Sequence, residues 1–278
     1  MSALRPGGWR GALAAEWLKV RRQRFPLLAL VLSVGAILAH AVIGIEPDTQ
    51  GSFNGYYVAM AAAKTGFSVA SILVLIYAST SVAGEATGGT LKLVLVRPVA
   101  RTAFLQAKVV LLIGLAVALT AAIGVTSWLL GLSHGYGDLV DHDLMGNPYT
   151  SLEAARLGWK PVTAVAIALP SLIATGALGL LISTLTDSSS TAATAAILVY
   201  LPLAFATEVF LTAEQQVFLF THHVTRGIDR AASLALAESA GWEADASIVE
   251  AGLVVPLATA VLLYALATLM FRRRNIAL

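Results

Sequence analysis

Residues 109–130, VVLLIGLAVALTAAIGVTSWLL, form an apolar run without a single charged side chain. A helix of about 20 apolar residues is long enough to cross the hydrocarbon core of a bilayer. Five further runs of similar length occur along the chain, at 26–45, 66–83, 162–185, 192–211 and 251–271. The sequence therefore predicts six transmembrane helices.

The composition supports a membrane protein of the all-α class. Hydrophobic residues make up 58% of the chain, charged residues only 12%, and the mean hydropathy of +0.80 is far above that of a soluble domain. The apolar runs lack the alternation of barrel strands and are about twice their length, so helices remain as the way to satisfy the backbone in lipid. Cysteine is absent, which excludes disulfides and thiolate metal sites.

The basic residues are distributed unevenly between the two sides of the membrane. Thirteen of the 18 Lys and Arg residues fall before the first span, between spans two and three, or after span six. The positive-inside rule then predicts a multi-pass protein of the cell membrane with both termini in the cytoplasm. Because these residues flank membrane spans, the pI of about 9.0 indicates lipid headgroups as partners and no nucleic acid. The first span is longer than a signal-peptide core, so we expect it to remain uncleaved.

The chain is expected to divide into two parts, a cytoplasmic segment over 1–25 and a permease domain over 26–278. In the first part Trp9, Leu13, Trp17 and Val20 recur at helical spacing, which predicts an amphipathic helix at the membrane interface. Its polar positions include Glu16, Lys19 and Arg22.

The loops expected on the outer side cover 46–65, 133–161 and 212–250. The middle one holds a set of possible metal ligands: His134, Asp138, Asp141, His142, Asp143 and Glu153. A lipid-acting metalloenzyme built on this set is one alternative, but the glycines and proline of the loop favour a solvated acidic turn region, and no metal site is expected.

The last outer loop contains an apolar patch, 217–220, followed by His222 and His223. This loop either dips into the outer leaflet as short helices or packs over the bundle. On the inner side, spans four and five are joined by only a few residues. Asp187 and the three serines that follow it provide N-cap residues for span five.

Little in the chain supports catalysis. The spans are nearly free of the ionisable groups that ion-coupled transporters and intramembrane proteases use. Gly84, Gly89 and Thr90 have the spacing of a phosphate-binding loop, but its lysine is missing and Lys92 comes too late. We therefore expect no catalytic residues and no ATP hydrolysis by this chain.

The polar stretch 84–108, GEATGGTLKLVLVRPVARTAFLQAK, is the best indication of function. Gly88 and Gly89 are expected to end the helix of span two, and Thr90 to cap a short apolar segment that Pro98 ends. An ordinary basic loop would explain Lys92 and the other cations, but not the glycine pair or Glu85. The stretch predicts a coupling helix that docks on a soluble partner, through Glu85, Gly88, Gly89, Thr90, Leu91, Leu93, Arg97, Pro98 and Arg101.

This stretch resembles the loop between spans two and three of type-2 ATP-binding-cassette (ABC) transporter permeases. The similarity lies in an acidic residue before a Gly-Thr-Leu unit, followed by Arg-Pro, Arg and Lys, here Glu85, residues 89–91, Arg97-Pro98, Arg101 and Lys108. The acidic-basic segment with Glu16, Lys19 and Arg22 and the order of loops are also similar.

The resemblance implies a membrane subunit that works with two copies of an ABC ATPase subunit and with a second copy of itself or of a similar permease. ATP and Mg²⁺ would be bound by the ATPase, and no cofactor by this chain. The implied activity is export of a hydrophobic or amphipathic solute. A permease-like subunit that supports assembly or signalling without transport is the alternative.

Overall fold

The computed structural model describes residues 9–43, 54–89, 101–142, 148–152, 157, 159–235 and 246–273. The long helices are α1 (Trp9–Arg22), α2 (Phe25–Ile43), α3 (Gly55–Thr87), α5 (Arg101–Gly131), α7 (Lys160–Leu185), α8 (Ser189–Val209) and α11 (Ala246–Arg273). Shorter elements are β1 (Leu139–His142), β2 (Pro148–Leu152), α9 (Ala213–Gln216), the 3-10 helix η1 (His222–Val224) and α10 (Arg226–Ala235). Within the described residues six helices, α2, α3, α5, α7, α8 and α11, are long and apolar enough to cross a membrane. The prediction of an all-α membrane domain with six spans is confirmed.

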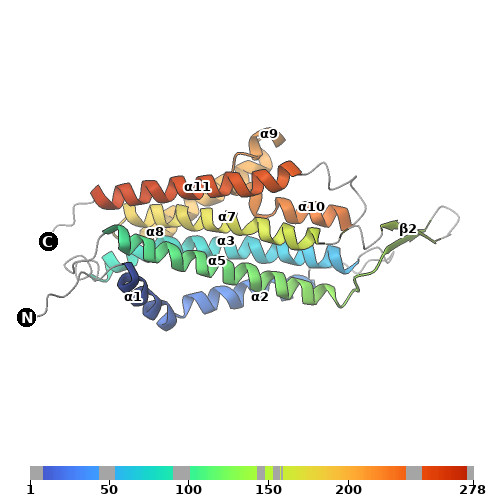
Figure 1. Ribbon diagram of the computed structural model, residues 1–278, viewed down its shortest axis with the longest axis horizontal. Helices are drawn as coiled ribbons and strands as arrows, with labels where there is room; N and C mark the ends of the chain where they lie inside the picture. Colours follow the sequence, from blue (N-terminus) through green and yellow to red (C-terminus); the bar gives the residue numbers. More distant parts are fainter. Residues whose placement is uncertain are drawn as a thin grey trace, which may run out of the picture.

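Helices α3 and α7 form the centre of the bundle (Figure 1). In their most apolar windows 56% and 61% of the residues are buried, against 17% in α2, α8 and α11. A Cβ atom added to Gly179 of α7 would lie 2.7 Å from the Leu75 carbonyl oxygen and 2.8 Å from the Ala78 Cβ, both on α3. The two central helices therefore approach closely because α7 has glycine at the contact, as is common between membrane helices.

The first outer loop is shorter than the sequence predicts, because α3 begins at Gly55 and not near residue 66. Asn54 caps this helix, and its side-chain oxygen accepts a hydrogen bond of 3.0 Å from the Tyr57 backbone N–H. Lys64 lies inside α3 and forms an ion pair of 2.7 Å with Asp229 of α10. Helix α3 therefore begins 11 residues before the span predicted from residue 66.

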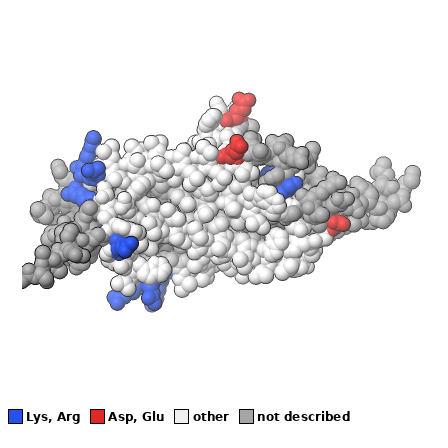
Figure 2. Space-filling view, in the orientation of Figure 1, with Lys and Arg blue, Asp and Glu red and all other residues white. Residues whose placement is uncertain are grey.

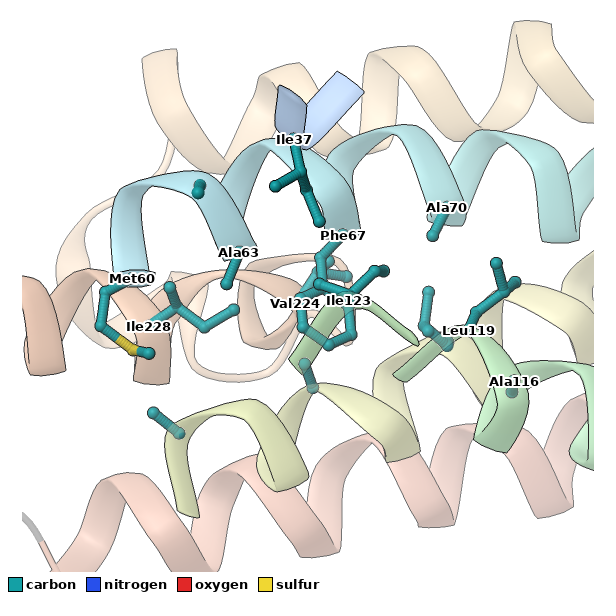
Figure 3. Packing of buried hydrophobic residues seen from close by; sticks show 14 of the residues in the cluster. Ile37, Met60, Ala63, Phe67, Ala70, Ala116, Leu119, Ile123, Val224 and Ile228 are labelled. Atoms are coloured by element: carbon teal, nitrogen blue, oxygen red, sulfur yellow. The ribbon is translucent and has the colours of Figure 1, made fainter. Parts of the chain in front are cut away.

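Two described elements of the last predicted outer segment, η1 and α10, pack on the bundle. Figure 3 shows Val224 of η1 beside Phe67 and Ile123, and Ile228 of α10 beside Met60, within the same buried cluster. Ile37 of α2 belongs to the same buried cluster. Residues from α2, α3, α5, η1 and α10 thus share one core.

The adjacent His222 and His223 have different surroundings. Their rings are 5.7 Å apart at 67° to each other. His223 is buried, and its Nε2 donates a hydrogen bond of 2.8 Å to the Val217 carbonyl oxygen. That contact gives His223 a structural role inside the segment that covers the bundle.

The middle outer loop contains an antiparallel hairpin in place of the irregular turn region expected. Strands β1 and β2 pair Asp141 with Tyr149 and His142 with Pro148. The expectation missed the β-forming residues on either side of residues 143–147, such as Val140 and Tyr149. Among the described residues no three His, Asp or Glu side chains are grouped so that they could hold a metal; Asp143 and Glu153 lie outside those residues.

Basic and acidic side chains are distributed unevenly along the long axis of the bundle. In Figure 2 the visible Lys and Arg side chains gather mainly at the end where α1 and the last turns of α11 lie, while Asp and Glu are visible toward the other end. The ends of α3 and α8 that flank inner loops in the predicted topology lie at the basic end.

Candidate functional site: the base of the loop between α3 and α5

The structure describes the two helix ends that flank the predicted coupling loop, the end of α3 and the start of α5, and we call them the bases of the loop. Helix α3 ends at Thr87 with Gly88 as its C-cap, and Gly89 has φ of 68°, a left-handed conformation that favours glycine. The expected helix end at the glycine pair is confirmed. On the other side α5 begins at Arg101, whose Nη1 donates a hydrogen bond of 3.1 Å to the Arg272 carbonyl oxygen.

Residues 90–100 lie outside the described residues, and they include Thr90, Leu91, Leu93, Arg97 and Pro98. The predicted coupling helix and its contacts with a partner therefore stay predictions. Gly84 lies inside α3, so the helix continues through the first position of the apparent phosphate-binding pattern.

Four charged side chains meet where the two bases of the loop approach α1. Lys108 of α5 is 2.6 Å from Glu85 Oε1 and 3.0 Å from Glu16 Oε2. Lys19 of α1 is 2.6 Å from Glu16 Oε1 and 3.0 Å from Glu85 Oε1. Each lysine thus bridges both carboxylates, and we call Glu16, Lys19, Glu85 and Lys108 the charge cluster.

The charge cluster is largely shielded from solvent. The side chains of Lys108 and Glu16 are 6% and 8% exposed, and that of Glu85 is 12% exposed, whereas Lys19 is 42% exposed. Lys108 Nζ also lies 4.8 Å from the centre of the Phe104 ring, a cation–π distance. Burial makes removal of a single charge costly, since its partners would stay desolvated and unpaired.

The pKa values of the two α1 residues reflect these contacts. Burial alone would raise the pKa of the Glu16 carboxyl, but the ammonium groups of Lys108 and Lys19 outweigh it and hold the pKa below its ordinary value. Burial would likewise lower the pKa of Lys19, but its hydrogen bond to Glu16 and the charge of Glu85 raise it above the ordinary value. Both groups are therefore charged near neutral pH.

A second set of contacts joins the same end of α3 to the turn between α7 and α8. The backbone N–H groups of Val82 and Ala83 each donate a hydrogen bond of 2.9 Å to Ser183 Oγ. Thr87 Oγ1 donates to the Asp187 carbonyl oxygen at 3.1 Å and accepts from the Ser189 N–H at 3.0 Å. The end of α3 thus contacts α1, α5, α7 and the start of α8.

These contacts modify the expected capping of α8. Its N-cap is Ser188, one of the residues predicted for that role, but the Ser188 side chain makes no capping hydrogen bond. The Thr87 hydroxyl on α3 accepts from the first turn of α8 in its place. The sequence could not show this partner, which is about a hundred residues away.

Helix α1 presents an unexpected face to the bundle. Its buried residues are Ala12 and Glu16, while Trp9 and Trp17 are 47% and 54% exposed. A helix is present at these positions, and its tryptophans remain free of the bundle, as contact with lipid headgroups would require; its position at the membrane interface stays a prediction. The inward position of Glu16 was missed, although an isolated acid among basic residues gave a signal for it.

Comparison with known proteins bears on the family of the chain. No curated protein matches the chain. A family model described as "ABC-2 family transporter protein" matches residues 12–187, from α1 to the turn before α8. The match covers more than half of the chain and includes all four residues of the charge cluster. The chain therefore belongs to the ABC-2 family of transporter proteins, as a multi-pass membrane subunit.

Proposed function

We propose that this chain is the permease of an ABC exporter, which moves a hydrophobic or amphipathic solute with ATP hydrolysed by a separate subunit. Membership of the ABC-2 family supports a transport role. The observation that carries the proposal is the charge cluster, because it joins α1 to both bases of the loop 84–108.

The cluster provides a route for mechanical coupling. A force on residues 90–100 acts on the end of α3 and on the start of α5, which Lys108 and Glu85 hold together. The same ion pairs join these helix ends to α1, and Ser183 joins α3 to α7. A push by a docked ATPase would therefore displace several helices as a unit, in the manner of a rigid-body transition.

The partners follow from the loop and from the charge distribution. Leu91 and Leu93 supply an apolar contact for a cleft on the ATPase, with Arg97 and Arg101 beside it. Two ATPase subunits, which hold ATP and Mg²⁺, would serve two permeases, either two copies of this chain or one copy and a similar chain. The basic end of the bundle (Figure 2) supports a cytoplasmic position for the loop, with the chain in the cell membrane.

Replacement of Leu91 and Leu93 by Asp tests the docking step. In a complex purified through a tag on the permease, the double variant should lose the ATPase subunit, since two carboxylates cannot enter an apolar cleft without a large desolvation cost. Phe218→Asp is the control, because Phe218 is 76% exposed and lies between α9 and η1. An undiminished yield of ATPase with the double variant would refute docking through this loop.

Reconstitution separates transport from a role in assembly. The permease and its co-purified ATPase are placed in liposomes with candidate amphipathic solutes, and ATP hydrolysis is measured. A transporter should show solute-stimulated hydrolysis and accumulation of the solute in the lumen of vesicles whose ATPase faces outward. Hydrolysis that no solute changes, with no accumulation, would favour the non-transporting alternative.

A further inference from the structure

A cavity of about 780 Å³ lies inside the corner between α1 and α2, against α3 and α5. The charge cluster forms part of its wall, and most of the remaining wall is contributed by residues that the coupling role does not use. Figure 1 shows the corner at the basic end of the bundle, where α1 turns back from the start of α2. The volume is in the usual range for a binding site of a small molecule.

The charged side chains that line the cavity include one more cation than anions. Glu16 and Glu85 are matched by Lys19 and Lys108 within the cluster. Arg24 also lines the cavity, and no described acidic side chain forms an ion pair with it. The described charged side chains of the wall therefore sum to +1, and the exposed side chain of Arg24 is accessible to an anion.

The remaining wall is amphipathic. Gln23 and Tyr77, which are joined by a hydrogen bond of 3.2 Å, contribute polar atoms. Phe25, Leu111 and Leu112 contribute apolar surface. Just beyond the cavity, α2 exposes a row of large apolar side chains, Leu27, Leu28, Val31 and Leu32.

We propose that this cavity binds one anionic phospholipid from the leaflet at the α1 end of the bundle. Its phosphate pairs with Arg24, its headgroup hydroxyls contact Gln23 and Tyr77, and its acyl chains follow the exposed apolar side chains of α2. A single phosphodiester charge balances the excess cation, whereas a zwitterionic headgroup would bring an ammonium group whose carboxylate partners are already paired. The site is independent of the proposed ATPase.

Two variants and two matched controls test the site in the full chain purified in detergent. Arg24→Gln removes the excess cation, and Arg22→Gln removes the same charge from a residue that is exposed like Arg24 but does not line the cavity. Gly84→Leu fills the cavity, since a Cβ at Gly84 meets nothing within 4 Å, and Gly11→Leu is an equally unobstructed change on α1. Binding of dioleoyl phosphatidylglycerol is followed by native mass spectrometry, with dioleoyl phosphatidylcholine and sn-glycerol 3-phosphate as comparators.

The wild-type chain should retain one phosphatidylglycerol in preference to phosphatidylcholine. Arg24→Gln should weaken its binding at least about tenfold, the loss expected for a charge-assisted hydrogen bond. Arg22→Gln should weaken it by less than about fivefold, as a surface charge does. Gly84→Leu should abolish the bound lipid while Gly11→Leu retains it.

Three results would overturn the assignment. Equal binding by Arg24→Gln and Arg22→Gln would remove the phosphate contact. Equal binding by Gly84→Leu and Gly11→Leu would place the lipid elsewhere. Displacement of phosphatidylglycerol by an equal concentration of sn-glycerol 3-phosphate would identify the ligand as a soluble phosphate and not a lipid.

Discussion

The two ends of the α3–α5 helix pair are joined by different kinds of contact. At the loop end, long Glu and Lys side chains hold α3 and α5 together with α1. At the opposite end the contact is made by backbone: Gly55 N–H donates a hydrogen bond of 2.8 Å to the Gly135 carbonyl oxygen, and Gly55 lies against Gly131. Tyr136 stacks on Trp128 beside them, with ring centres 4.4 Å apart.

This difference has a mechanical consequence. Flexible charged side chains can keep their contacts while the helices shift, whereas a glycine contact between backbones allows almost no displacement. The glycine end is therefore suited to act as a fixed point, and the charged end is suited to receive movement from the loop.

The largest effect should come from enlarging a glycine at the fixed end. A Cβ at Gly131 would overlap the Gly55 carbonyl oxygen and the Tyr136 hydroxyl. Gly131→Leu should therefore lower the free energy of unfolding by about 3 kcal/mol, as strong overpacking does. Denaturation in detergent, followed by tryptophan fluorescence, measures the loss.

Gly114→Leu provides the control on the same helix, because a Cβ there meets nothing within 4 Å. Similar unfolding curves for the two variants would show that the glycine end is not a rigid contact.

At the charged end, the two lysines should differ in their contribution. Lys108→Met removes one of the two lysines that bridge the carboxylates and should cost about 2 kcal/mol of unfolding free energy, less than a fully broken buried ion pair because Lys19 remains. Lys19→Met removes a lysine whose side chain is 42% exposed and should cost less than about 1 kcal/mol. Both lysines bridge the same carboxylates, so the difference between the two losses measures the effect of burial. Equal losses in the same denaturation assay would contradict the burial argument.

The attachment of α1 should depend on pH. The lowered pKa of Glu16 contributes stability above the unfolded value of 4.5, and this is lost as pH falls through the folded value. The raised pKa of Lys19 contributes stability below 10.5, lost as pH rises through its folded value. Since the chain lacks cysteine, spin labels at Leu18→Cys and Gln106→Cys report the distance between α1 and α5 without background.

The distribution of α1–α5 distances should be narrow near neutral pH, where Glu16 and Lys19 are both charged. It should broaden as the pH falls through the folded pKa of Glu16. Among the described residues the contact of Gly55 with Gly131 and Gly135 involves no charged side chain, and labels placed at Ser133→Cys and Val162→Cys should show no acid-dependent change over the same range. A distance distribution that stays narrow after the Glu16 carboxyl has become protonated, as followed by infrared spectroscopy, would mean that the ion pairs do not hold α1.

A small effect should come from the contact between α3 and α8. Thr87→Val removes the hydroxyl that accepts from the Ser189 N–H and should cost about 1 kcal/mol, the net value of a typical hydrogen bond. Hydrogen exchange at Ser189 should accelerate. Thr163→Val is the control, since its hydroxyl only donates within its own helix turn to Trp159. Unchanged exchange at Ser189 would exclude Thr87 as the partner of this N–H group.

The six spans could be predicted because a long apolar run has few alternatives to a membrane helix. The first 11 residues of α3 were not predicted as part of the span because Lys64 interrupts the apolar pattern, and its partner Asp229 is far away in the sequence. The helix end at Gly88 was predicted from local chemistry alone.

The candidate site was predictable only in part. Glu16, Lys19 and Glu85 were singled out one by one, and Lys108 was noted as part of the loop pattern. Their convergence depends on how α1 folds back against α3 and α5, which spacing along the chain does not specify. Thr87 and Ser183 carried no signal in the sequence, because a hydroxyl in a helix is most often bonded to its own backbone.

The proposed function requires that the loop 84–108 faces the cytoplasm and is held by a separate ATPase. Lys92→Cys in this cysteine-free chain gives a single reactive site within the loop. A membrane-impermeant maleimide should label it in inside-out vesicles and not in intact cells, and added ATPase subunit should protect it, whereas Leu132→Cys at the other end of the bundle should show the opposite sidedness. Labelling of Lys92→Cys from outside intact cells, or full labelling in the presence of the ATPase, would contradict the account.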